Sequence, residues 1–78
     1  MIQVNGGHMI NFGKYCREYR MSKGVTLAQL SPDINIKTLS AFEMGRSSNI
    51  KLLEPYIKLS IKHNESHEFF NGLTEGMK

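Results

Sequence analysis

The chain has 78 residues, 40% of them hydrophobic, and a formal net charge of +3. A chain of this length is expected to form one domain, because it is too short to support two hydrophobic cores. It has no apolar run near the roughly 20 residues that a membrane-spanning helix needs and no recognisable leader, so we expect a cytoplasmic location. The single cysteine, Cys16, has no partner for an internal disulfide, which fits a reducing compartment.

The positive charge is concentrated in one part of the sequence. Residues 14–51 contain seven basic side chains and three acidic ones, whereas residues 52–78 contain three basic and four acidic ones. A local excess of this kind suits a surface that meets phosphate groups. A basic face that is merely solvated is the alternative.

The first predicted helix follows a short arm. Residues 1–10 show no sustained periodicity, so we expect them to form a flexible arm. Asn11 is a suitable cap for a helix that runs to about residue 23 and ends at Gly24. The apolar side chains that recur at helical spacing are Phe12, Cys16 and Tyr19, with Tyr15 beside them.

A very short second helix is expected from Leu27 to Ser31. Thr26 can cap its first turn, and Pro32 blocks its continuation. Leu27 and Leu30 are three residues apart, so both can face the core.

The third predicted helix covers residues 35–44. Asn35 can accept a backbone N–H of the first turn, and Gly45 can adopt the left-handed conformation that closes the last one. Leu39 and Phe42 form its apolar face. Side chains that fall on other parts of the cylinder are Lys37, Ser40, Ala41 and Met44.

Two further helices complete the expected set of five. The fourth begins near residue 50, has Pro55 in its first turn, and is followed by a polar break. Its core stripe is predicted to be Tyr56, Ile57, Leu59 and Ile61. The fifth is predicted to run from Ser66 to Gly72, and residues 74–78 are expected to fray.

Two parts of this pattern resemble the Cro/repressor-type helix-turn-helix family, which includes phage repressors and small bacterial regulators. The first part is an arginine followed by a glycine, an aliphatic residue and a cap: Arg20, Gly24, Val25 and Thr26. The second lies in and just after the third helix: Thr38-Leu39-Ser40, Glu43 and Gly45. The resemblance implies an all-α, five-helix, lambda-repressor-like domain over residues 11–73, with residues 35–44 as the recognition helix.

The resemblance also implies how double-stranded DNA would be bound. In this family the recognition helix enters the major groove, which short outward side chains allow it to approach closely. The implied base contacts are Ile36, Lys37, Ser40 and Ala41. The implied phosphate contacts are Thr26, Arg46, Ser47, Ser48 and Lys51.

A buried ion pair between Arg20 and Glu43 is expected on two grounds. The family has an arginine and a glutamate at the matching positions, and they pair. Independently, Glu43 lies near the C-terminal end of its helix, where the helix dipole disfavours a carboxylate, so a cation is needed beside it.

A homodimer is expected on DNA, because one recognition helix reads too few base pairs for useful specificity. Its seam is predicted at the C-terminal part of the chain, around Phe69, Phe70 and Leu73. The alternative is that both phenylalanines pack on the domain's own core.

A second function stays open beside DNA binding. The stretch from Thr26 to Glu43 is shorter than is usual in the family, and residues 35–44 contain no Arg or Gln, the side chains that pair well with guanine and adenine. The alternative is a repressor-like fold that acts as a protein-binding inhibitor or antirepressor without specific DNA binding.

Catalysis and metal binding are not expected. His63 and His67 are four residues apart, but the sequence offers no obvious third ligand for a metal ion. The chain contains no glycine-rich phosphate loop, CxxC motif or nucleophile elbow, and it is too short to build a deep pocket. We therefore predict no cofactor and no enzymatic activity.

Overall fold

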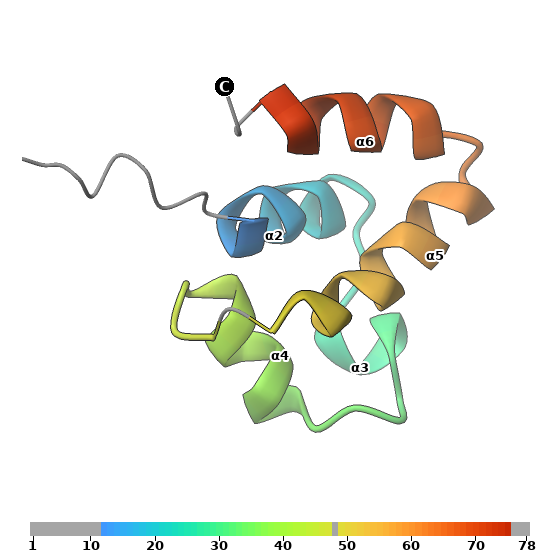
Figure 1. Ribbon diagram of the computed structural model, residues 1–78. Helices are drawn as coiled ribbons and strands as arrows, with labels where there is room; N and C mark the ends of the chain where they lie inside the picture. The colour runs from blue at the N-terminus through green and yellow to red at the C-terminus, as the bar shows by residue number, and fades with distance from the viewer. Residues whose placement is uncertain (1–11, 48, 76–78) are drawn as a thin grey trace, which may run out of the picture.

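The computed structural model describes residues 12–47 and 49–75, and all regular structure in these two segments is helical (Figure 1). The elements in chain order are α2 (Phe12–Ser22), α3 (Leu27–Leu30), α4 (Ile36–Glu43), the 3₁₀ helix η1 (Ile50–Leu53), α5 (Glu54–Lys62) and α6 (Ser66–Glu75). The predicted arm at residues 1–10, the Asn11 cap and the end of the chain at 76–78 lie outside the described residues. None of the helices in the described segments combines the length and the apolar composition that a membrane-spanning helix needs.

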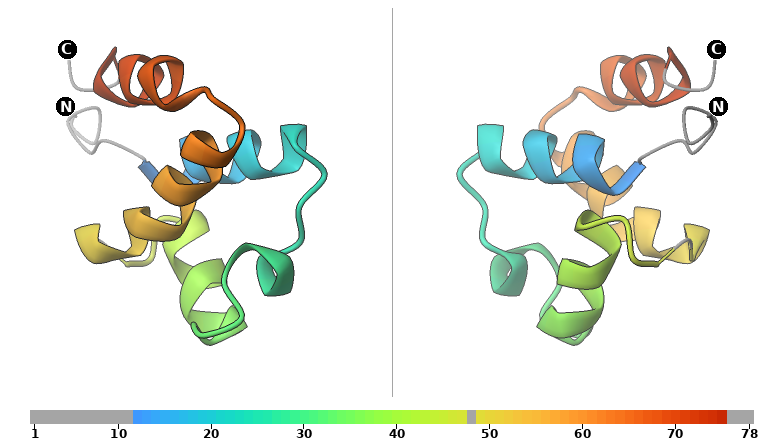
Figure 2. Two further views of the ribbon diagram at one scale, coloured as in Figure 1. Left: turned by 90° about the vertical axis from the view of Figure 1, so that its right-hand side faces the viewer. Right: turned by 90° about the vertical axis from the view of Figure 1, so that its left-hand side faces the viewer.

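The helices are stacked in three tiers (Figures 1 and 2). In Figure 1, α6 lies above α2, and α3 and α4 lie together below it, while α5 connects the tiers on one side. The core is formed where α2, α4, η1, α5 and α6 face one another. Its buried side chains are Cys16, Leu39, Phe42, Leu52, Leu53, Tyr56, Phe69 and Leu73.

Three helices end in the same way, with one residue in the left-handed conformation. These residues are Gly24 after α2 (φ 67°), Gly45 after α4 (φ 79°) and Asn64 after α5 (φ 58°). After α4, the Arg46 N–H donates to the Ala41 carbonyl at 2.8 Å, which is the bond of a Schellman cap. Equivalent bonds follow α2 and α5. Each of the three helices therefore ends sharply, and the chain changes direction there.

The start of α4 is held by the predicted cap. The Asn35 side chain accepts the Lys37 N–H at 2.7 Å. Asn35→Ala is expected to lower the free energy of unfolding by about 1 kcal/mol, because an exposed helix N-terminus loses its acceptor. Urea denaturation would measure the loss. Asn35→Asp keeps the acceptor and is expected to retain wild-type stability, so an equal loss in both variants would contradict the capping role.

Helices α2 and α4 approach closely at Gly13. A Cβ atom at this position would overlap the carbonyl group of Phe42. Gly13 is therefore the point at which the backbone of α4 rests on α2, and any larger residue there would push the two helices apart.

One sequence prediction about the core and one about the end of a helix are wrong. Ile61 was expected in the core together with Tyr56 and Leu59, but only those two are buried, and the Ile61 side chain is 58% exposed. Helix α6 was expected to end at Gly72, but it continues to Glu75. Glycine is needed within the helix at position 72, because the hydroxyl group of Tyr15 lies where a Cβ atom would be.

Candidate nucleic-acid interface

The outward face of α4 consists of short or flexible side chains. Ile36 is 51% exposed, Lys37 is exposed, and Ser40 and Ala41 are partly exposed. Leu39 and Phe42 lie on the opposite side of the helix and are buried. The structure thus brings the four predicted base-contact residues to the solvent-facing side of one helix.

At the start of α3, Thr26 forms a capping box with Gln29. The Gln29 N–H donates to Thr26 Oγ1 at 3.1 Å, and the Thr26 N–H donates to Gln29 Oε1 at 2.9 Å. The Thr26 oxygen is thus already an acceptor, but its hydroxyl proton is available to a phosphate. Gln29 was not among the predicted site residues, although a Thr followed by Gln three positions later is a recognisable capping pattern.

The loop that follows α4 carries the remaining predicted phosphate contacts. Arg46 and Lys51 are exposed, and Ser47 is partly exposed. Ser47 Oγ accepts the Asn49 N–H at 3.3 Å, and Asn49 Oδ1 accepts the Lys51 N–H at 3.1 Å. The second bond caps the start of η1. Ser48 lies outside the described residues.

A cluster of Arg20, Glu43 and Tyr56 fixes the C-terminal end of α4. Arg20 donates through Nε to Glu43 Oε2 at 2.8 Å and through a second guanidinium nitrogen to Oε1 at 2.9 Å. The Arg20 and Glu43 side chains are 13% and 4% exposed, so the structure contains the largely buried pair expected from the sequence. The hydrogen bond from Arg20 to Glu43 helps to raise the pKa of Arg20, which keeps the guanidinium charged.

Tyr56 is the third member of this cluster, and sequence analysis did not identify its role. Its hydroxyl group donates to Glu43 Oε2 at 2.6 Å. The pKa of Tyr56 is raised mainly by burial and also by this hydrogen bond. Arg20 also donates to the Val25 carbonyl at 2.7 Å. The cluster therefore ties α4 to α2, to α5 and to the turn before α3.

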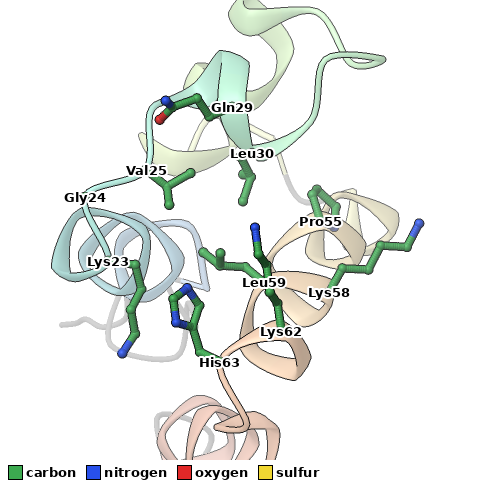
Figure 3. Close-up of a pocket in the computed structure, with 10 residues that line it drawn as sticks. All are labelled: Lys23, Gly24, Val25, Gln29, Leu30, Pro55, Lys58, Leu59, Lys62 and His63. Carbon is green, nitrogen blue, oxygen red and sulfur yellow. The ribbon is translucent and has the colours of Figure 1, made fainter.

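A basic groove lies between the end of α2, α3 and α5 (Figure 3). It has a volume of about 590 Å³, and no acidic residue lines it. Its apolar walls are Val25, Leu30, Pro55 and Leu59, and its basic side chains are Lys23, Lys58, Lys62 and His63. In Figure 3 the Lys62 amine points into the groove, whereas the Lys23 and Lys58 amines point away from it. Sequence analysis missed this groove because three separate segments build it.

No group of three or more His, Cys, Asp or Glu side chains that could hold a metal ion occurs within residues 12–47 and 49–75. Cys16 is completely buried in the core. Burial and, to a smaller extent, the charge of Glu43 raise the pKa of its thiol to about 12. The thiol therefore stays protonated at neutral pH and acts as a packing group.

The predicted dimer seam at Phe69, Phe70 and Leu73 requires correction. Phe69 is 1% exposed and packs against the rings of Tyr15 and Tyr19, at centroid distances of 5.3 and 4.9 Å. Leu73 is also buried in the domain's own core. Of the three, only Phe70, at 41% exposure, presents much surface to a second molecule.

Comparisons with known proteins found no relative of this chain. No family model matches the chain, and neither a curated protein nor a solved structure matches it.

Proposed function

We propose that the domain is a lambda-repressor-like helix-turn-helix module that binds double-stranded DNA and regulates transcription. In this proposal α3 and α4 form the helix-turn-helix, and α4 enters the major groove. The observation that carries the proposal is the exposed face of α4, which bears no acidic side chain and is anchored from behind by the buried Arg20–Glu43–Tyr56 cluster. Specific readout needs such a rigidly supported helix, because a loosely held one would lose its register with the bases.

Base readout would come from the outward face of α4. Lys37 can donate to the O6 and N7 atoms of guanine, and Ser40 can donate or accept. Ile36 and Ala41 can contact the methyl group of thymine. These four side chains are exposed or partly exposed, so they can reach bases without unfolding any part of the domain.

Phosphate contacts would flank this face. Arg46 and Lys51 supply positive charge, and Thr26 and Ser47 supply hydroxyl groups, a combination that positions a protein on the DNA backbone. Ser48 belongs to the same predicted set. Because these contacts release counterions, binding is expected to weaken as the salt concentration rises.

Lys37→Ala and Ser40→Ala are expected to preserve the fold and to weaken binding to a selected duplex by about 1–3 kcal/mol for Lys37 and less for Ser40. Each substitution removes a group that faces the bases, while the buried residues of α4 stay unchanged. The measurement is a titration of a duplex chosen by in vitro selection, followed by fluorescence anisotropy.

Lys62→Ala is the matched control for Lys37→Ala. It removes the same charge from an exposed residue of α5, in the basic groove, and is expected to affect binding much less. Equal losses in the two lysine variants would mean that only net charge matters, and α4 would not be the reading helix.

A protein-binding module is the second candidate function, and the basic groove favours it. The apolar walls together with the Lys62 amine, which points into the groove, would fit an acidic segment of a partner protein. Random-sequence duplex separates the two functions. Affinity at low salt that falls as salt rises supports DNA binding, whereas no affinity even at low salt supports the protein-binding module.

A further inference from the structure

The basic groove between the end of α2, α3 and α5 combines apolar walls with one inward amine (Figure 3). Val25 and Leu30 contribute partly exposed side chains to one wall, and Pro55 and Leu59 contribute buried ones to the other. The Lys62 amine points into the space between them. Lys62 is exposed and forms no ion pair within residues 12–47 and 49–75.

The other two lysines of the groove are directed elsewhere. The Lys23 amine pairs with Glu65 and lies 5.4 Å from the centroid of the Tyr19 ring. The Lys58 amine points away from the groove. No acidic side chain lines the groove, so its one inward lysine charge is complementary to a ligand with a single negative charge.

The backbone donors around the groove are already used. The N–H groups of Lys23, Gly24 and Val25 donate to carbonyl groups of α2, and those of Gln29 and Leu30 donate to the cap of α3. The lining residues of α5 lie within or at the end of that helix, where the N–H groups bond to the preceding turn. A peptide would therefore find no backbone donor to pair with, whereas a small anion needs only a side chain.

We propose that this groove binds a small amphipathic monocarboxylate. The apolar body of the ligand lies against Val25, Leu30 and Leu59, and its carboxylate accepts a charge-assisted hydrogen bond from the Lys62 amine. The volume of about 590 Å³ lies within the range of clefts that hold small molecules. Because the groove is open to solvent at Lys62 and offers one charge, the affinity is expected to be weak, in the upper micromolar to millimolar range.

This inference goes beyond the proposed function and does not depend on it. No residue of α4 lines the groove, so the ligand would leave the outward face of that helix uncovered. Binding of the ligand is therefore measured on the full chain without DNA.

The test is a titration of the full chain with sodium octanoate, followed by the NMR chemical shifts of the backbone amides. Octanoate is expected to produce saturable shifts at Val25, Leu30 and Leu59. Acetate has the charge without the apolar body, and 1-octanol has the apolar body without the charge. Each is expected to bind at least about fivefold more weakly than octanoate, because each lacks one of the two contacts.

Two lysine variants test the position of the carboxylate. Lys62→Gln is expected to raise the dissociation constant of octanoate at least about fivefold. Lys58→Gln is the matched control, because it removes the same charge from a neighbouring turn of α5 whose amine points away, and it is expected to change the constant less than about twofold. Circular dichroism confirms beforehand that both exposed-site variants are folded.

Four results would overturn the inference: no saturable shift up to millimolar octanoate, saturation only at amides outside the groove, octanol binding as tightly as octanoate, or equal effects of the two lysine variants. Binding of an acidic peptide in the groove without any response to octanoate would also overturn it, in favour of the protein-binding module. Failure here and failure of DNA binding are separable. A chain that binds octanoate but no duplex overturns only the proposed function, and a chain that binds duplex but no octanoate overturns only this site.

Discussion

Glu43→Gln is expected to lower the free energy of unfolding by roughly 3–5 kcal/mol, a large share of the total for a domain of this size. The substitution removes the negative charge that faces Arg20 while leaving the guanidinium in a largely buried position. Tyr56 keeps an acceptor in the amide oxygen, so the loss reports mainly on the stranded arginine. Arg20→Met leaves the buried Glu43 carboxylate without its cation and is expected to lower the free energy of unfolding by a similar amount.

Urea denaturation of the two single variants and the double variant measures the coupling. The double variant is expected to lose less free energy of unfolding than the two single variants lose together, because it leaves no unpaired charge buried. Glu65→Gln provides a control with the same chemistry on the surface, since Glu65 pairs with Lys23 and accepts the Tyr19 hydroxyl at 2.8 Å. A much smaller loss is expected there, and equal losses at the two glutamates would contradict the importance of burial.

Gly13→Ala is expected to destabilise the domain by roughly 3 kcal/mol, at the upper end of the usual range for overpacking. The new methyl group would overlap the Phe42 carbonyl, and a backbone group of a packed helix cannot rotate away as a side chain can. Helices α2 and α4 must therefore separate, which also strains the pair between Arg20 and Glu43. Thermal and urea denaturation would both report the loss.

Gly72→Ala is the matched control for Gly13→Ala. At Gly72 the added methyl group would meet the hydroxyl oxygen and two ring carbons of Tyr15, a side chain that can turn away at the cost of its hydrogen bond to the Phe69 carbonyl. Alanine gains about 1 kcal/mol of helix propensity at both positions, so the smaller loss expected at Gly72 reflects an obstacle that is a side chain and not a helix backbone. If both glycine variants were equally stable, the close contact between α2 and α4 would be refuted.

Sequence reasoning succeeded where the information is local. The caps at Thr26 and Asn35 and the left-handed stop at Gly45 involve neighbouring residues, and the structure contains all three. Helix-end electrostatics called for a cation beside Glu43, and the resemblance to the repressor-type family identified Arg20 as that cation. Tyr56 could not be added, because its contact with Glu43 depends on how α5 crosses α4, which no local pattern encodes.

The errors have a common origin in tertiary packing. Helix α5 carries apolar residues on two sides, so periodicity predicts the helix without deciding which side faces inward, and Ile61 was assigned to the wrong one. Adjacent Phe69 and Phe70 presented the same ambiguity. The glycine at position 72 resembles a helix stop, yet its missing side chain serves to admit Tyr15. The basic groove could be recognised only in the assembled fold, because three separate segments build it.

The Arg20–Glu43–Tyr56 cluster fixes the C-terminal end of α4 more firmly than its N-terminal end is fixed. Its C-terminal end is bonded to two other helices, whereas its N-terminal end is held by its own Asn35 cap and by α3, a four-residue helix without a fully buried side chain. Because Glu43 is fixed from two sides, the cluster sets the direction in which the rest of α4 points, including Ile36 and Lys37 at its far end.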